Sequence, residues 1–254
     1  MKHSLLIIPL SILLGCSEDN QQKATNAIPL EKQHVQSIRL HALPAKEKKE
    51  NTQQTRPKKV VLDVPLIKQL PELKYGCEVT SLAMVLQYAG VRVDKLTLAK
   101  QIAKDNDPKI QRRGNIISWG NPADGFVGDM TGKSSGYAVF DQPIVELMEK
   151  YLPERAVNLT GRPFSELLTY VANKRPVVVW TTGDYRLPDR WESWKHGNRV
   201  IRTPLDLHVV VLVGFDERFV YINDPLWGKK AYRVDKQQFI QSWIALKKRA
   251  VSYR

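Results

Sequence analysis

A helical pattern of apolar residues begins just after the second cysteine of the chain. Four residues spaced i, i+3, i+4 and i+7 share one face of the predicted helix: Val79, Leu82, Ala83 and Leu86. Gly76 is a permissive residue before the first turn, and Gly90 suits the left-handed conformation just past the last turn. The pattern therefore predicts a helix that starts near Cys77 and ends before Gly90, with the cysteine in its first turn.

The other apolar patterns predict a mixture of helices and strands. Further helices are predicted at residues 94–103, 143–151, 163–171 and 235–243, the first of them capped by an aspartate. Strands are predicted at residues 60–67, 156–159, 177–180, 207–215, 219–225 and 231–234. Residues 107–142 and the segment between Tyr185 and His196 have no sustained period and are expected to be loops. Long loops of this kind often line binding sites.

Two of the predicted strands form a hairpin that brings a histidine and an aspartate together. The strands at residues 207–215 and 219–225 flank a turn, and His208 and Asp224 are each eight residues from Asp216. Residues symmetric about the centre of a hairpin lie side by side. A carboxylate beside an imidazole fixes its tautomer and favours the imidazolium. The hairpin thus predicts a histidine base with an orienting carboxylate.

Each of these two residues also has a structural interpretation. His208 taken alone fits a core histidine bonded to backbone, and Asp224 taken alone fits a turn residue before Pro225. Asn223 would replace Asp224 as the orienting group if the register slipped by one residue. His196 is a rival imidazole, but its predicted loop offers no placed carboxylate. Only the pairing of His208 with Asp224 favours a functional interpretation.

Cys77 is the candidate nucleophile because of its predicted position in the first turn of a helix. Free backbone N–H groups and the positive end of the helix dipole meet there, so the thiol pKa is expected to be lowered. Otherwise Cys77 is a small buried apolar residue. Gln69 lies eight residues before Cys77 and offers an amide N–H that an oxyanion site can use. Gln69 also fits a surface loop.

The N-terminus resembles a bacterial lipoprotein signal. Residues 1–16 carry a positive charge at Lys2, then a short apolar run that ends at Leu13-Leu14-Gly15-Cys16, which resembles a lipobox. By that resemblance Cys16 is the lipidated first residue of an exported, membrane-anchored protein; an ordinary signal peptide or a short anchor is the alternative. Because the chain has two cysteines, lipidation would leave Cys77 as the single thiol. Exported cysteines are usually paired, so a lone one is either buried or reactive.

Composition adds a polar tether and a strong positive charge. Residues 17–59 are polar, without a sustained period, and are expected to be a disordered tether before one domain at residues 60–254. The chain of 254 residues carries a formal net charge of +13. Such a balance favours an anionic partner, such as an envelope polymer or a membrane surface, or serves solubility alone. No motif of the usual nucleic-acid-binding kinds is present, so nucleic acid is not an expected partner.

Several of these residues together resemble the C39-like, papain-type cysteine peptidases of bacteria. The resemblance covers about residues 60–246, and the residues that carry it are Gln69, Gly76–Ser81, Gly125–Gly128, Gly136–Tyr137, His208 and Asn223–Pro225. The resemblance implies an α+β, papain-like cysteine peptidase fold, with the nucleophile on a central helix packed against an antiparallel sheet. It implies Cys77 as nucleophile, His208 as base, Asp224 as orienting group and Gln69 as oxyanion donor.

The function expected on this basis is a lipid-anchored cysteine peptidase of the cell envelope that cleaves a peptide or protein substrate. A cell-wall peptide amidase or a transpeptidase would use the same site. A catalytically silent peptide-binding module is the alternative from another class, and it would need a broken triad. A backbone group could serve as the main oxyanion donor in place of Gln69. Cysteine peptidase chemistry needs no cofactor and no metal, and none is expected.

Overall fold

The structure is a computed structural model that describes residues 57–254. The predicted signal peptide at residues 1–16, with Cys16, lies outside the described residues, as does the predicted tether at residues 17–59 except for its last three residues. Among residues 57–254, no helix has both the length and the apolar character that crossing a membrane requires.

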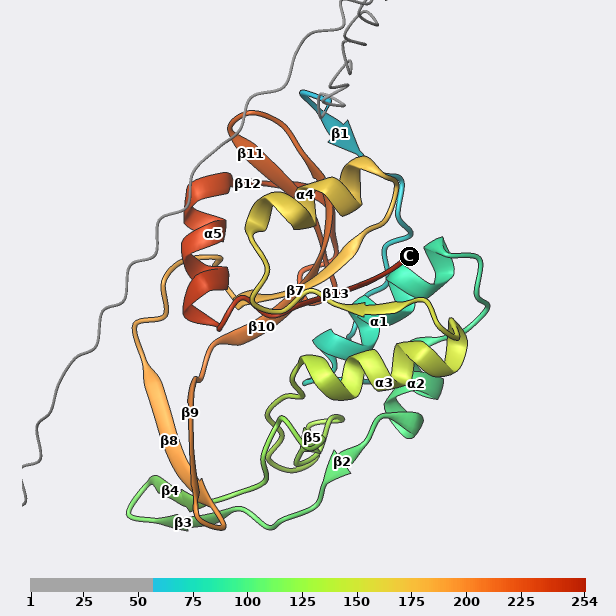
Figure 1. Cartoon of the computed structure of the whole chain (residues 1–254). Coiled ribbons are helices and arrows are strands. Elements are labelled where there is room, and N and C mark those ends of the chain that lie inside the picture. The colour runs from blue at the N-terminus through green and yellow to red at the C-terminus, as the bar shows by residue number, and fades with distance from the viewer. Residues whose placement is uncertain (1–56) are drawn as a thin grey trace, which may run out of the picture. The chain divides into compact units, whose positions relative to one another are not determined.

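The centre of the fold is an antiparallel sheet (Figure 1). Its strands run in the order β12 (Lys229–Asp235), β11 (Phe219–Asp224), β10 (Leu207–Phe215), β7 (Val177–Thr182), β13 (Ala250–Tyr253) and β6 (Ala156–Asn158), and β1 (Val60–Val61) pairs with the end of β10. Strand β7 is buried at every residue and β10 at all but its first. This burial explains why both strands are unbroken apolar runs in the sequence.

Helices cover both faces of this sheet. They are α1 (Cys77–Tyr88), α2 (Lys95–Gln101), α3 (Asp141–Tyr151), α4 (Phe164–Ala172) and α5 (Lys236–Ala245). Figure 1 shows α1, α2 and α3 on one side of β7 and β10, and α4 and α5 on the other. Helix α1 lies against β10, and its first ten residues are buried all round. It is therefore the central helix that the resemblance implied, and the predicted α+β class is confirmed.

Local signals in the sequence account for where the helices begin and end. The carboxylate of Asp94 accepts a hydrogen bond from Thr97 N at 2.7 Å and caps α2, as predicted. Asp235 caps α5 in the same way, through Gln237 N and Gln238 N. Gly90 lies just beyond α1 with φ at +89°, the left-handed conformation predicted for it.

Both segments predicted to be loops contain short strands. Residues 107–142 hold β3 (Ile110–Arg112), β4 (Asn115–Ser118) and β5 (Phe126–Val127), and β5 pairs with β2 (Lys104–Asp105). The later segment holds β8 (Trp191–His196), which forms a hairpin with the following β9 (Arg199–Pro204). This hairpin joins β3 and β4 in a second sheet. Trp119, Tyr137 and Trp194 pack together as a small separate core beneath it. Strands β3, β4 and β5 have four residues or fewer, too few to show a period, whereas β8 and β9 are longer but mostly not buried, so they lack a sustained apolar pattern.

Candidate active site

The backbone around Gly76 brings Cys77 to the start of α1. Gly76 precedes the helix with φ at −107°, so glycine is not required here for a left-handed conformation. A Cβ atom at Gly76 would lie 2.6 Å from Leu73 Cβ, so glycine is needed for this close approach. Thr80 closes the first turn, because its N–H and its hydroxyl both donate to Gly76 O, at 3.0 and 2.7 Å. Cys77 itself is only 7% exposed.

The thiol of Cys77 is not activated in the way that its position in the helix predicts. Burial raises its pKa well above the usual range, and the neighbouring carboxylate of Glu78 raises it further. The backbone N–H of Val209 acts in the opposite direction but with a smaller effect. The predicted lowering of the pKa is therefore wrong. The partial charge at a helix end is roughly half a unit, and here desolvation together with the Glu78 carboxylate outweighs it.

Glu78 is the residue of the site that the sequence analysis missed. Its side chain is fully buried; Oε1 accepts from Val139 N at 2.9 Å, and Oε2 accepts from Cys77 Sγ at 3.4 Å. Burial raises the pKa of this carboxyl group to about 7. Its position directly after the candidate nucleophile, in the first turn of the predicted helix, was the available signal.

His208 and Asp224 meet as predicted, but not directly opposite each other. The hairpin pairs Val211 with Asn223, so continuing the register puts Asp224 opposite Val210, two residues from His208. The turn is centred about one and a half residues later than predicted, and the bulge in β10 takes back one residue of the resulting shift, which leaves two. Residues two apart on a strand point to the same face, so the side chains still meet diagonally. His208 Nε2 lies 3.1 Å from Asp224 Oδ2, and both side chains are buried.

The carboxylate of Asp224 is held by four donors. Oδ2 accepts from Tyr185 Oη at 2.5 Å as well as from His208, and Oδ1 accepts from Leu226 N at 2.8 Å and Trp227 N at 2.9 Å. Burial alone would raise the pKa of Asp224, but the hydrogen bond and the charge of His208, with the other donors, lower it to about 2. Asp224 is therefore ionised at neutral pH. Tyr185 is a second residue of the site to which the sequence analysis gave no role.

Asn223 does not take the place of Asp224. Its Nδ2 donates to Val64 O at 3.0 Å, and its Oδ1 accepts from Ala231 N at 2.8 Å. The neighbouring residue of a strand faces the opposite side of the sheet, which is why Asn223 ties β11 to the entering segment and to β12. Of the two alternatives for the orienting group, the geometry favours Asp224.

Gln69 lies next to the Asp224 turn, because its backbone N–H donates to Pro225 O at 2.9 Å. It is buried, not on a surface loop, and its Nε2 donates to Lys74 O at 2.9 Å. Its Oε1 is buried and is the one side-chain oxygen or nitrogen in residues 57–254 that is fully enclosed without a hydrogen-bond partner. One N–H of the amide remains for another acceptor. The environment of Gln69 is thus compatible with an oxyanion donor.

Val209, which follows His208 in β10, lies next to Cys77. Ser81 Oγ on α1 donates to Val209 O on β10 at 3.2 Å, and the N–H of Val209 faces the Cys77 thiol. His208 precedes Val209, so the start of α1 and the start of β10 adjoin. A buried thiol and a paired imidazole and carboxylate therefore lie where the start of α1 meets the start of β10.

Comparisons with known proteins identify the family. The model of the family described as "Peptidase_C39 like family" matches residues 61–251, so the chain belongs to that family. The chain is 39% identical to the Bacillus subtilis (strain 168) protein called "Uncharacterized protein YvpB" over 192 residues. The aligned region covers 75% of this chain and 74% of that protein. A crystal structure of a Bacillus anthracis protein assigned as a C39-like peptidase matches with a TM-score of 0.71 and 42% identity, covering 78% of this chain and 98% of that chain.

Proposed function

We propose that this protein is a cysteine peptidase that hydrolyses peptide bonds through Cys77, His208 and Asp224. The observation that carries the proposal is the buried hydrogen bond of 3.1 Å between His208 Nε2 and Asp224 Oδ2, beside the start of α1. A carboxylate kept ionised by its own hydrogen bonds is suited to hold a histidine in a single tautomer. Membership of a peptidase family supports the same conclusion.

The geometry assigns a direction to proton transfer. Because Asp224 is ionised, the neutral imidazole donates from Nε2 to Oδ2, and Nδ1 is left as the proton acceptor. In the proposed reaction Nδ1 takes the proton of the Cys77 thiol as the sulfur attacks the peptide carbonyl carbon. The resulting imidazolium returns this proton to the leaving amine as the C–N bond breaks. Water then hydrolyses the thioester and restores the thiol.

The negative oxygen formed in the attack needs hydrogen-bond donors. The backbone N–H of Cys77 is one of the unpaired donors at the start of a helix, and the remaining N–H of the Gln69 amide is a second. The hydrogen bond from Gln69 Nε2 to Lys74 O holds the amide in place. We propose that both groups contribute.

The direct test uses the purified full chain and a library of short fluorogenic peptides. Cleavage by the native chain and not by Cys77→Ala would support the proposal, with mass spectrometry of the products to separate hydrolysis from transfer to a second amine. Both proteins must show the same thermal unfolding curve. A library cleaved equally by the two proteins would contradict the role of Cys77, and products that carry only an added amine would identify a transpeptidase.

We further propose that the protein is anchored to the envelope membrane through a lipid on Cys16, on the basis of Leu13-Leu14-Gly15-Cys16 and the polar sequence that follows. When the protein is produced in a bacterium, most of the native chain is expected in the detergent phase of a Triton X-114 separation. Most of a Cys16→Ser variant is expected in the aqueous phase, because it lacks the acyl chains. Retention of Cys16→Ser in the detergent phase would exclude lipidation as the cause.

A further inference from the structure

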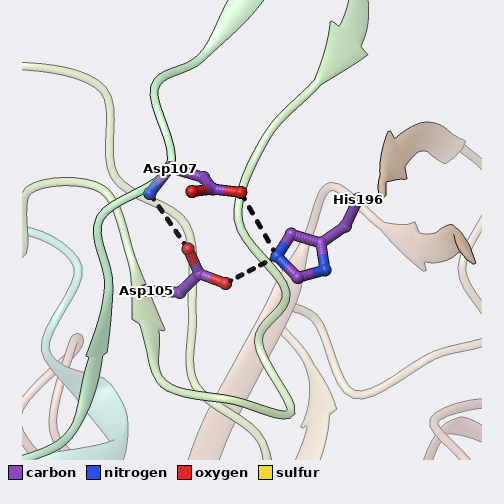
Figure 2. Close-up of side chains that lie close together, drawn as sticks. All are labelled: Asp105, Asp107 and His196. Atoms are coloured by element: carbon purple, nitrogen blue, oxygen red, sulfur yellow. Dashed lines mark hydrogen bonds and ion pairs between the residues drawn. The ribbon is translucent and has the colours of Figure 1, made fainter. Parts of the chain in front are cut away.

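A second group of polar side chains lies outside the proposed active site (Figure 2). His196 is the last residue of β8, Asp105 is the last residue of β2, and Asp107 follows two residues later. His196 Nε2 lies 3.1 Å from Asp105 Oδ2 and 3.3 Å from Asp107 Oδ2. The sequence analysis expected His196 in a loop without a carboxylate. The structure instead directs two carboxylates at the same ring nitrogen.

One hydrogen bond from His196 Nε2 cannot account for both carboxylate contacts. A ring nitrogen carries at most one N–H, and that N–H cannot point at two oxygens with good geometry. A tetrahedral metal ion with ligand bonds of about 2.1 Å separates neighbouring ligand atoms by about 3.4 Å. The two distances at His196 are close to this value, and the ligand atoms of all three side chains lie within 4.8 Å of one another.

The backbone holds Asp105 in position independently of His196. Its Oδ1 accepts from Asp107 N at 3.0 Å, and its Oδ2 accepts from Asn121 N at 2.9 Å. Gly120 leaves the room that this carboxylate needs, because a Cβ atom there would lie 2.9 Å from Asp105 Cγ. The side chain of Asp105 is only 9% exposed, whereas that of Asp107 is 62% exposed. Hydrogen bonds that fix a ligating carboxylate are a regular feature of metal sites.

We propose that Asp105, Asp107 and His196 bind a divalent transition-metal ion of the Zn²⁺ class. One imidazole nitrogen and two carboxylate oxygens are a ligand set that such ions accept, with water in the remaining position. Asp105 and Asp107 line a cavity of about 480 Å³, which has room for that water. Lys109 and Asp129 line the same cavity and offset each other in charge, so Asp105 and Asp107 leave two net negative charges for the cation. The Lys109 ammonium lies over the Trp119 ring.

The ion would join two parts of the chain that are distant in sequence. It would link the tip of the β8–β9 hairpin to the segment after β2, and β9 leads directly into β10, which carries His208. Its expected role is to hold this hairpin. The proposal is independent of the peptidase reaction, since none of its three residues touches Cys77, His208 or Asp224 among the hydrogen bonds and ion pairs of residues 57–254.

The test measures metal binding and not activity. The host is the tag-free full chain with Cys77→Ala, so that the Cys77 thiol cannot bind metal. Cys16 and every histidine other than His196 are common to all the variants. After dialysis against Zn²⁺ at pH 7.5, elemental analysis is expected to give one more zinc ion per chain for the host than for the host with His196→Gln. Glu192→Gln, which changes a partly buried glutamate on the same hairpin, is the control and should retain the ion. Equal zinc contents for the host and His196→Gln would overturn the proposal and leave an ion pair only.

A second variant guards against misfolding of His196→Gln. Asp107 is mostly exposed, so Asp107→Asn should fold normally and yet bind Zn²⁺ at least about tenfold more weakly, because it loses a charged ligand. Zn²⁺ should also raise the melting temperature of the host and of Glu192→Gln, and should raise that of Asp107→Asn by clearly less at the same Zn²⁺ concentration. A zinc-dependent rise of the same size in Asp107→Asn would place the ion elsewhere and contradict the assignment.

Discussion

Replacing Cys77 or His208 by alanine is expected to lower peptide hydrolysis by a factor on the order of 10⁴ or more, because each removes a group on which bond formation depends. Asp224→Ala should retain more activity, since a misoriented imidazole still samples the productive tautomer. Adding Asp224→Ala to His208→Ala should cost little more, because the two residues act as one unit through their hydrogen bond of 3.1 Å. The measurement is kcat/KM for all four variants on one peptide found in the library.

The control for this series is Asp224→Asn. Asp224 Oδ1 also accepts from Leu226 N and Trp227 N, so alanine removes turn contacts together with the orienting carboxylate. Asparagine can keep the two contacts to the turn while it removes the charge beside His208. Comparable losses in Asp224→Asn and Asp224→Ala would assign the effect to the carboxylate. Full activity in both would remove Asp224 from the mechanism.

Replacing Glu78 by glutamine is expected to stabilise the protein at pH 8 by roughly 3 kcal/mol, from a pKa raised from 4.5 to about 7. The folded protein holds this proton up to about pH 7, whereas the unfolded chain releases it near pH 4.5. Between these values the folded state binds more protons, so its stability falls as the pH rises. Glutamine never ionises, and Val139 N can still donate to its amide oxygen. Urea unfolding of both proteins between pH 4.5 and pH 8 measures the difference.

The same substitution should make Cys77 more reactive. The carboxylate of Glu78 is one of the causes that raise the thiol pKa, and a neutral amide at that position can donate to a thiolate. Alkylation by iodoacetamide at pH 8 should therefore be faster in Glu78→Gln than in the native chain. Glu146→Gln, which changes a solvent-facing glutamate on α3, is the control for general effects of charge. For the stability prediction, the contrary outcome is a constant difference in the free energy of unfolding between the native chain and Glu78→Gln from pH 4.5 to pH 8. That result would show that Glu78 does not titrate in this range.

Local pattern was sufficient for most of the elements and for the pairing of two candidate site residues. The apolar spacing after Cys77 predicted α1, Asp94 and Gly90 marked helix ends, and two runs of apolar residues predicted β10 and β11. These features depend on residues close together in sequence, where period, capping and turn chemistry act directly. The pairing of His208 with Asp224 was predictable because a hairpin is a local structure. An error of two residues in register preserved it, since side chains two apart share a face.

The parts that could not be predicted depend on contacts between distant segments. Strand β13 lies between β7 and β6 at the end of the chain, and a run of only four buried residues shows no period. His196 meets Asp105 only because β8 joins the second sheet beside β4.

For this protein, the sequence by itself determined the family, the order of most elements and the three residues proposed for catalysis. Tertiary structure alone decided the state of the thiol: the helix start favours a thiolate, whereas burial beside Glu78 raises the thiol pKa. It also decided which carboxylates the two histidines contact: His208 contacts one ionised aspartate, and His196 contacts two aspartates. The physical reason is that desolvation and charge act through space, and the residues that exert them are brought together only by the packing of the whole domain.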